Sequence, residues 1–183
     1  MWAWDTMSPS EDRKRFADAV NAAMLRLAVD PRTVFVGQSV RWGGAAMYAS
    51  LEGVPMEQRI EVPVAEDFQL GFCLGLALMG QRPVCLFPRM DFLLLAANQL
   101  VNHLDKVTLF GWPTPRLIIR TTVGQKTPLD AGPQHTQNHT DAFRLMLSRV
   151  VVMQVRTPEE VEVAYEDAVW TSPWPRLIVE NPL

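Results

Sequence analysis

The sequence has little cysteine, little histidine and no excess of positive charge. Its 183 residues include two cysteines and three histidines, and 17 lysines and arginines against 20 aspartates and glutamates give a formal net charge of −3. Cys73 and Cys85 both sit inside apolar runs, so we expect small core residues, not a disulfide framework or a metal cluster. An acidic chain has no electrostatic footprint for nucleic acid or for an anionic membrane, and we predict neither partner.

Long hydrophobic runs and a signal peptide are also missing. The first seven residues lack the basic region and apolar stretch of a secretory signal. The longest apolar segments, residues 68–79 and 90–101, are shorter than a membrane span and contain polar residues. We therefore expect a soluble, cytoplasmic protein. Because the chain has 183 residues, we expect a single domain over residues 1–183, and the 48% of hydrophobic residues are enough for an ordinary core.

What the sequence does contain is an alternation of short apolar runs and helical patterns. Ser8-Pro9-Ser10-Glu11 has the signals of a helix start, and the helix is expected to end at Pro31. Periodicity predicts further helices over residues 66–80, 90–104, 142–147 and from 157 onward. It predicts strands at residues 33–36, 60–64, 84–87, 117–122, 150–155 and 177–179. Short strands that are apolar on both faces indicate a three-layer α/β/α fold with a mainly parallel sheet.

Parallel sheets bind ligands in the loops at the carboxyl ends of their strands, and three segments are predicted to lie there. They are residues 37–44, residues 64–67 and a long polar loop over residues 123–140. Glu66 follows a strand and begins a helix that is apolar nearly all round, in which Gly71 and Gly75 would allow close approach to a neighbour. Its carboxylate is favoured there by the helix dipole alone, or it is a partly buried group suited to proton sharing. Position alone favours the first interpretation.

The polar loop contains two histidines but no metal motif. His135 and His139 have the spacing of some zinc sites, yet no glutamate follows His135 and no helix is predicted there, so we expect no metal. Gly124-Gln-Lys-Thr127 lacks the earlier glycine of a phosphate loop, and no Gly-x-Gly-x-x-Gly occurs. The chain therefore has no phosphate cradle of its own, which weighs against a flavodoxin-like nucleotide binder.

A series of short motifs follows in a fixed order along the chain. Val62-Pro-Val-Ala-Glu66 leads to Gly71-x-x-x-Gly75 and then to Gly80-x-Arg-Pro-Val84. The later motifs are Asp91-Phe92, Gln99-x-x-Asn102-x-x-x-Lys106, Gln134-His-Thr-Gln137 and Leu177-Ile-Val-Glu-Asn181. In their order and spacing they resemble the pyrimidine-binding domain of thiamine-diphosphate enzymes. The pattern is most similar to the beta subunit of the 2-oxo-acid dehydrogenase decarboxylase component, with transketolases as more distant relatives.

The resemblance implies roles for three residues. Glu66 matches the glutamate that hydrogen-bonds N1′ of the cofactor's aminopyrimidine and favours the imino tautomer that generates the ylid. Phe92 matches the aromatic residue that stacks on the pyrimidine, and His135 matches the histidine that faces the reacting acyl group. The implied cofactor is thiamine diphosphate, and the implied reaction is decarboxylation of a 2-oxo acid or transfer of its acyl or ketol group.

The sequence departs from this family at two points. Gln38 stands where the family has a carboxylate that relays protons between active sites, and the chain stops at Leu183, where the family continues into a C-terminal transketolase domain. The Gly-Asp-Gly motif of the diphosphate-binding half is also missing. The resemblance therefore implies a partner subunit that holds Mg²⁺ and the diphosphate, in an α2β2 heterotetramer acting on a small-molecule substrate. The alternative is a degenerate pyrimidine domain that only scaffolds or regulates such a partner.

Overall fold

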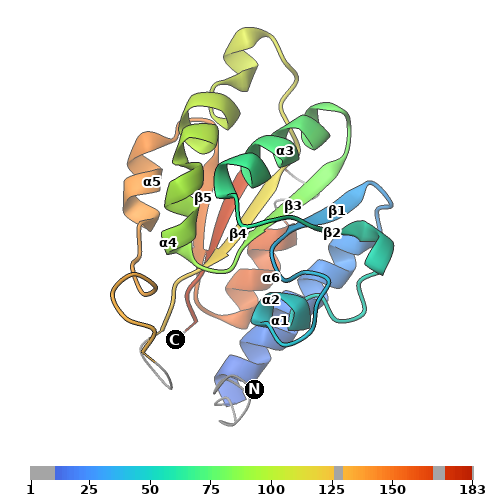
Figure 1. Cartoon of the computed structure of the whole chain (residues 1–183), viewed down its shortest axis with the longest axis vertical. Helices are drawn as coiled ribbons and strands as arrows, with labels where there is room; N and C mark the ends of the chain where they lie inside the picture. Colours follow the sequence, from blue (N-terminus) through green and yellow to red (C-terminus); the bar gives the residue numbers. More distant parts are fainter. Residues whose placement is uncertain (1–10, 126–129, 167–171, 183) are drawn as a thin grey trace.

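A computed structural model describes residues 11–125, 130–166 and 172–182 (Figure 1). Within these ranges six strands form one sheet in the order β2-β1-β3-β4-β6-β5, and every neighbouring pair is parallel. The strands are β1 (Thr33–Gly37), β2 (Arg59–Glu61), β3 (Arg82–Phe87), β4 (Ile118–Thr122), β5 (Val151–Val155) and β6 (Arg176–Glu180). The predicted parallel sheet is confirmed. The predicted strand over residues 60–64 ends earlier, before Pro63, because proline has no N–H for the ladder.

Helices cover both faces of the sheet, as the three-layer prediction requires (Figure 1). One face carries α1 (Glu11–Ala28), the short α2 (Ala46–Ala49) and α6 (Pro158–Glu166). The other carries α3 (Glu66–Leu78), α4 (Met90–Leu93) and α5 (Thr140–Met146). The core-facing side of α1 consists of Phe16, Val20, Ala23, Met24 and Leu27, all of which are buried. The start signal expected at Ser8 lies outside the described residues.

The segment after β3 differs from the single helix predicted over residues 90–104. It consists of α4, a 3-10 segment η3 (Leu94–Ala96) and a π-helical segment η4 (Gln99–Leu104). Apolar residues occupy nearly every position between Met90 and Ala97, so their pattern does not report the helical pitch. Leu100 and Leu104 of η4 are both buried in the core.

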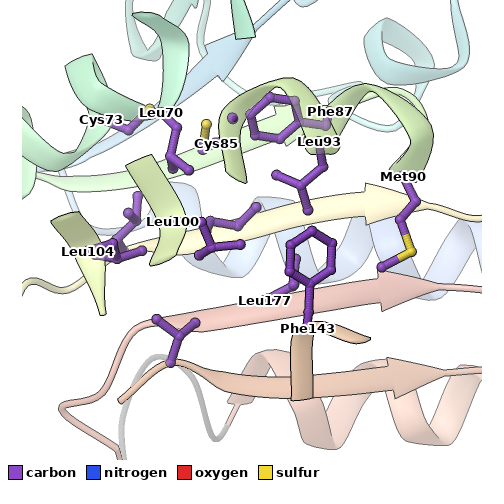
Figure 2. Packing of buried hydrophobic residues seen from close by; sticks show 14 of the residues in the cluster. Leu70, Cys73, Cys85, Phe87, Met90, Leu93, Leu100, Leu104, Phe143 and Leu177 are labelled. Carbon is purple, nitrogen blue, oxygen red and sulfur yellow. The ribbon is translucent and has the colours of Figure 1, made fainter. Parts of the chain in front are cut away.

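The core between the sheet and α3, α4, η4 and α5 is tightly filled (Figure 2). Cys73 and Cys85 lie together in it as free, fully buried thiols, which confirms their predicted role as core residues. Burial raises the pKa of the Cys73 thiol. The expected close approach of α3 to a neighbour is confirmed for Gly71, where a Cβ would lie 3.3 Å from the side chain of Gln99. It is wrong for Gly75, where a Cβ would have nothing within 4 Å among the residues that the structure describes.

Charged residues in the sheet contradict the expectation that every strand is apolar on both faces. Arg120 of β4 donates from Nε and Nη2 to the two carboxylate oxygens of Glu180 on β6, at 2.7 and 3.0 Å. The Tyr165 hydroxyl of α6 donates to Glu180 Oε1 at 2.9 Å, and burial together with the Glu180 charge raises the pKa of Tyr165 well above its usual value. This buried network ties two central strands to the helix that covers them.

Candidate functional site

The carboxyl ends of the parallel strands bring the three predicted segments to one edge of the sheet. Gln38 directly follows β1, and Glu66 follows β2 after a four-residue connection. Phe92 lies in α4, just beyond the end of β3, and the loop that contains His135 follows β4. Since all these strands run in the same direction, their carboxyl ends face the same side, which is where parallel sheets bind ligands.

Glu66 is the first residue of α3 and is buried, with 6% of its surface exposed. Gln38 Nε2 donates a hydrogen bond to Glu66 Oε1 at 3.3 Å. The carboxylate thus stands at a helix N-terminus, largely shielded from water, with one neutral side-chain donor beside it. An amide can orient this carboxylate but cannot take up or release its proton.

Glu61, at the end of β2, fixes the backbone next to Gln38. Its carboxylate accepts hydrogen bonds from the backbone N–H groups of Ser39, Val40 and Arg41 at 2.6, 2.8 and 3.0 Å. Ser39 has a φ of 56°, a left-handed conformation that successive N–H contacts of this kind hold in place. Sequence reasoning missed Glu61, although an acid at the end of the strand that leads to Glu66 was available as a signal.

Arg59, on the same short strand, organises the remainder of the segment after β1. It is buried, and its guanidinium donates to the backbone carbonyls of Val40, Leu51 and Val54. Its carbon Cζ also lies 5.2 Å from the ring centroid of Tyr48. Burial lowers the pKa of Arg59. Arginine on a short edge strand is usually exposed, so the sequence offered no signal for this role.

The rings of Phe92 and His135 are in contact. Their centroids are 5.4 Å apart and the ring planes are perpendicular, at 89°. The loop reaches this position because Gly124 has no side chain: a Cβ there would lie 1.7 Å from the carbonyl oxygen of His135. Both rings are half-buried, so each retains a surface that a ligand can contact. The structure therefore brings together two residues that lie 43 positions apart in the sequence.

The described residues form two small groups at this edge and no metal centre. Among them, no hydrogen bond or ring contact joins Glu66 to Phe92 or to His135. His139 lies apart from His135, with its backbone N–H directed to the sulfur of Met90 at 3.2 Å. No group of three histidine, cysteine, aspartate or glutamate side chains in the described ranges is placed to bind a metal.

No helix of this part of the chain is long and apolar enough to cross a membrane. Residues 126–129, at the end of the Gly124–Thr127 motif, lie outside the described residues.

Comparison with known proteins gives one matching family model and several relatives. The model described as "Transketolase, pyrimidine binding domain" matches residues 12–181. The chain is 29% identical over 164 residues to 2-oxoisovalerate dehydrogenase subunit beta 2, mitochondrial, of Arabidopsis thaliana, covering 86% of this chain and 45% of that protein. It is 28% identical over 116 residues to 2-oxoisovalerate dehydrogenase subunit beta of Bacillus subtilis (strain 168), covering 60% of this chain and 35% of that protein.

A solved structure has the same fold. The structure titled "Split gene transketolase, inactive beta4 tetramer" superimposes with a TM-score of 0.68 at 14% sequence identity. The match covers 93% of this chain and 51% of that one. At this level of identity the likeness concerns the fold alone. The chain spans less than half the length of the two beta subunits it matches, so their complete activities and assemblies do not transfer to it directly.

Proposed function

The chain belongs to the family of the transketolase pyrimidine-binding domain, and from this membership we propose that it is the smaller subunit of a split thiamine-diphosphate-dependent enzyme. The proposed reaction is decarboxylation of a 2-oxo acid, with or without transfer of its acyl or ketol group. Both beta-subunit relatives are named as subunits of a 2-oxo-acid dehydrogenase, which supports this substrate class. The observation that carries the proposal is Glu66, a buried carboxylate at the carboxyl edge of the sheet.

The side chains at this edge fit an aminopyrimidine ring. Gln38 binds only Oε1 of Glu66, so the carboxylate retains acceptor capacity for a ring nitrogen. Phe92 is half-buried and presents an aromatic surface of the kind that stacks on a heteroaromatic ring. When bound, thiamine diphosphate supplies a centre that stabilises negative charge on a carbonyl carbon. Glu66 and Phe92 would hold its pyrimidine.

The proposed chemical work of this chain is proton transfer at Glu66 and contact with the substrate at His135. Shielding from water strengthens the hydrogen bond between a carboxyl group and a ring nitrogen, and it keeps the shared proton within the pair. Gln38 holds the carboxylate in orientation through Oε1. His135 lies against Phe92, so it is placed to donate or accept a hydrogen bond at the reacting carbonyl group.

A diphosphate-binding partner subunit completes the proposed site and would hold Mg²⁺. Four exposed apolar side chains lie within three residues of Glu66 or Phe92 in the sequence: Val64, Phe68, Leu94 and Leu95. We call these four residues the rim patch. The α3 and η3 segments that carry most of them pack against each other, so the patch borders the proposed site. Apolar surface in such a position is typical of a subunit interface, and we propose an α2β2 heterotetramer in which residues 1–183 form one pyrimidine-binding domain.

Glu66→Gln tests the proposal directly. Glutamine keeps the size and hydrogen-bonding capacity of the side chain but cannot supply the acid proton. In the complex reconstituted with a diphosphate-domain partner, we expect exchange of the cofactor's thiazolium C2 proton and turnover to fall by ~10²–10⁴-fold. Exchange is measured by NMR after acid quench, and turnover by 2-oxo-acid consumption. Glu162→Gln, at an exposed position of α6, is the matched control. Unchanged exchange in Glu66→Gln would remove the basis of the proposal.

A second candidate function is that of a pyrimidine-domain scaffold or regulatory subunit. The observation that favours it is Gln38, because its amide, which donates to Glu66, cannot relay protons as a carboxylate would. The same experiment separates the two functions. A scaffold would stabilise its partner with or without the Glu66 carboxylate, so Glu66→Gln would leave both assembly and turnover unchanged.

A further inference from the structure

We propose that Asp91 is the positioning residue that holds His135 against Phe92, and that it acts through Gln137. The inference rests on the proposed function insofar as it concerns the purpose of His135, but the positioning itself is a property of this chain alone. The sequence pattern drew attention to Phe92 and His135 and assigned nothing to the aspartate between Met90 and Phe92.

The contact is a pair of hydrogen bonds on one carboxylate oxygen. Asp91 Oδ1 accepts from Gln137 Nε2 at 2.9 Å and from the Gln137 backbone N–H at 3.4 Å. Gln137 lies two residues beyond His135 in the same loop. Because both the side chain and the backbone of Gln137 are bound, the contact restrains the loop backbone as well as the side chain. Hydrogen bonds to an ionised acceptor are also stronger than those between neutral groups.

The position of Asp91 in α4 couples the two rings. Asp91 precedes Phe92, so a single short helix carries both the aromatic ring and the carboxylate that anchors the facing loop. On the far side of His135, the loop rests on Gly124, where any Cβ would collide with the His135 carbonyl. His135 is thus held between a backbone contact at Gly124 and the Gln137 anchor. Loss of the anchor leaves only one side of the loop restrained.

The second oxygen of Asp91 shows that burial of this carboxylate serves more than packing. Asp91 is 9% exposed, and Oδ2 is buried without a hydrogen-bond donor in the part of the chain that the structure describes. Buried carboxylate oxygens without donors are rare because removing them from water is unfavourable. The positive charge of Arg89 nearby offsets part of this cost: burial lowers the pKa of Arg89, and Asp91 opposes that change. A carboxylate kept at such a site is more typical of positioning or ligand contact than of a core.

The test is NMR of the histidine rings in the full, unliganded chain. In the wild type, the ring current of Phe92 displaces the proton shifts of His135, whereas His103 is exposed and serves as an internal reference. We expect Asp91→Ala to abolish this displacement and Asp91→Asn, which retains the Oδ1 acceptor, to preserve it. Gln137→Ala removes the 2.9 Å hydrogen bond but keeps the backbone N–H, so it should reduce the displacement. The double variant should match Asp91→Ala, as expected for two residues that act as one unit. Asp141→Ala, at an exposed position of α5, is the control and should leave His135 unchanged.

Each outcome is decisive. The inference would be overturned if the proton shifts of His135 are unchanged in folded Asp91→Ala. It would equally be overturned if Gln137→Ala leaves those shifts unchanged. If Asp91→Ala fails to fold, Asp91→Asn and Gln137→Ala still test the inference. Both keep an oxygen acceptor at position 91, which is the amide carbonyl in Asp91→Asn and the carboxylate in Gln137→Ala. In the reconstituted enzyme, Gln137→Ala should lower turnover by up to ~10²-fold through misplacement of His135 while C2 proton exchange is retained. A wild-type complex without thiamine-dependent activity would refute the proposed function and leave the NMR result standing.

Discussion

The smallest unit of the proposed site is the hydrogen bond between Gln38 and Glu66. A single substitution at position 38 changes the net charge of this pair. The amide donates to the carboxylate at 3.3 Å, so the two side chains attract each other without competing for a proton. A carboxylate in place of the Gln38 amide would make two acids face each other, with one proton shared between them. The Gln38–Glu66 pair therefore orients the Glu66 carboxylate but does not relay protons. It differs from a pair of carboxylates in its chemistry and not in its shape.

Gln38→Glu should convert this pair into two facing carboxylates. The folded variant then takes up a proton that the unfolded chain does not hold, so its free energy of unfolding falls as the pH rises through the range of about 5–7. We expect a loss on the order of 1 kcal/mol at pH 7 relative to the wild type, since raising the pKa of one carboxyl by a single pH unit corresponds to about 1.4 kcal/mol. Urea unfolding at several pH values measures it. Gln134→Glu, in the exposed part of the loop, is the control, and equal behaviour of both variants would contradict the predicted repulsion.

The proposed site residues were accessible from the sequence to different degrees. Glu66, Phe92 and His135 lie in segments that follow β2, β3 and β4, so their common location at the carboxyl edge follows from the parallel direction of these strands. Glu61 and Asp91 were missed because their roles depend on backbone groups of other segments, at Ser39 to Arg41 and at Gln137. Periodicity indicates which face of an element is buried, but not which distant N–H group a carboxylate meets.

At the scale of elements, Asp30 joins the end of α1 to the starts of β1 and β3. Its carboxylate accepts from Arg32 Nε at 3.0 Å and Nη2 at 2.8 Å, and it pairs with Arg82 Nη1 at 2.7 Å. The hydrogen bonds from Arg32, together with the charge of Arg82, lower the pKa of Asp30 from 3.8 to about 2. One acid thus links three elements at the edge of the sheet opposite to the proposed site.

Asp30→Asn should reduce stability in a pH-dependent manner. A carboxyl whose pKa is lower in the folded state contributes stability above its unfolded pKa of 3.8, and this contribution disappears as the pH falls through about 2. We expect a loss of about 1–2 kcal/mol at pH 7, less than the lowered pKa alone would imply, because the ion pairs are partly exposed to solvent. Chemical denaturation at pH 7 and at pH values below 4 measures it. Asp18→Asn, at an exposed site of α1, should have little effect, and a pH-independent loss at Asp30 would exclude this electrostatic origin.

Element boundaries were predictable where a proline interrupts the sequence pattern and unpredictable where no such residue occurs. Pro31 and Pro63 mark real ends, because α1 and β2 stop before them. The change from α4 through η3 to η4 has no such marker, since no proline or glycine occurs between Met90 and Leu104. Arg120 lies inside a strand that was predicted to be apolar on both faces, yet it and Glu180 neutralise each other inside the molecule. Only the pairing of β4 with β6, a long-range feature, makes their burial possible.

At the scale of the whole molecule, the chain presents one side of the proposed site. The carboxylate, the aromatic ring and the histidine lie at a single edge, and the rim patch beside them is apolar and uncovered. The described part of the sheet has helices on both faces, so the edge and the patch are the natural places for a second subunit (Figure 1). The fold thereby explains why a partner would both complete the site and cover apolar surface.

Phe68→Ser and Leu95→Ser should weaken assembly with the diphosphate-domain partner while leaving the chain folded. These side chains are 53% and 64% exposed, so each contributes little to the core of the isolated subunit. Burying a large apolar side chain at an interface is worth roughly 1.5–3 kcal/mol, which corresponds to a ~10–100-fold weaker dissociation constant for each variant. Analytical ultracentrifugation of the mixed subunits measures the constant, and circular dichroism monitors the fold. Val163→Ser, 61% exposed on α6 at the opposite face of the sheet, is the matched control. If the control weakens assembly as much as Phe68→Ser does, or if none of the three variants has an effect, the partner binds elsewhere and the proposed location of the subunit interface is wrong.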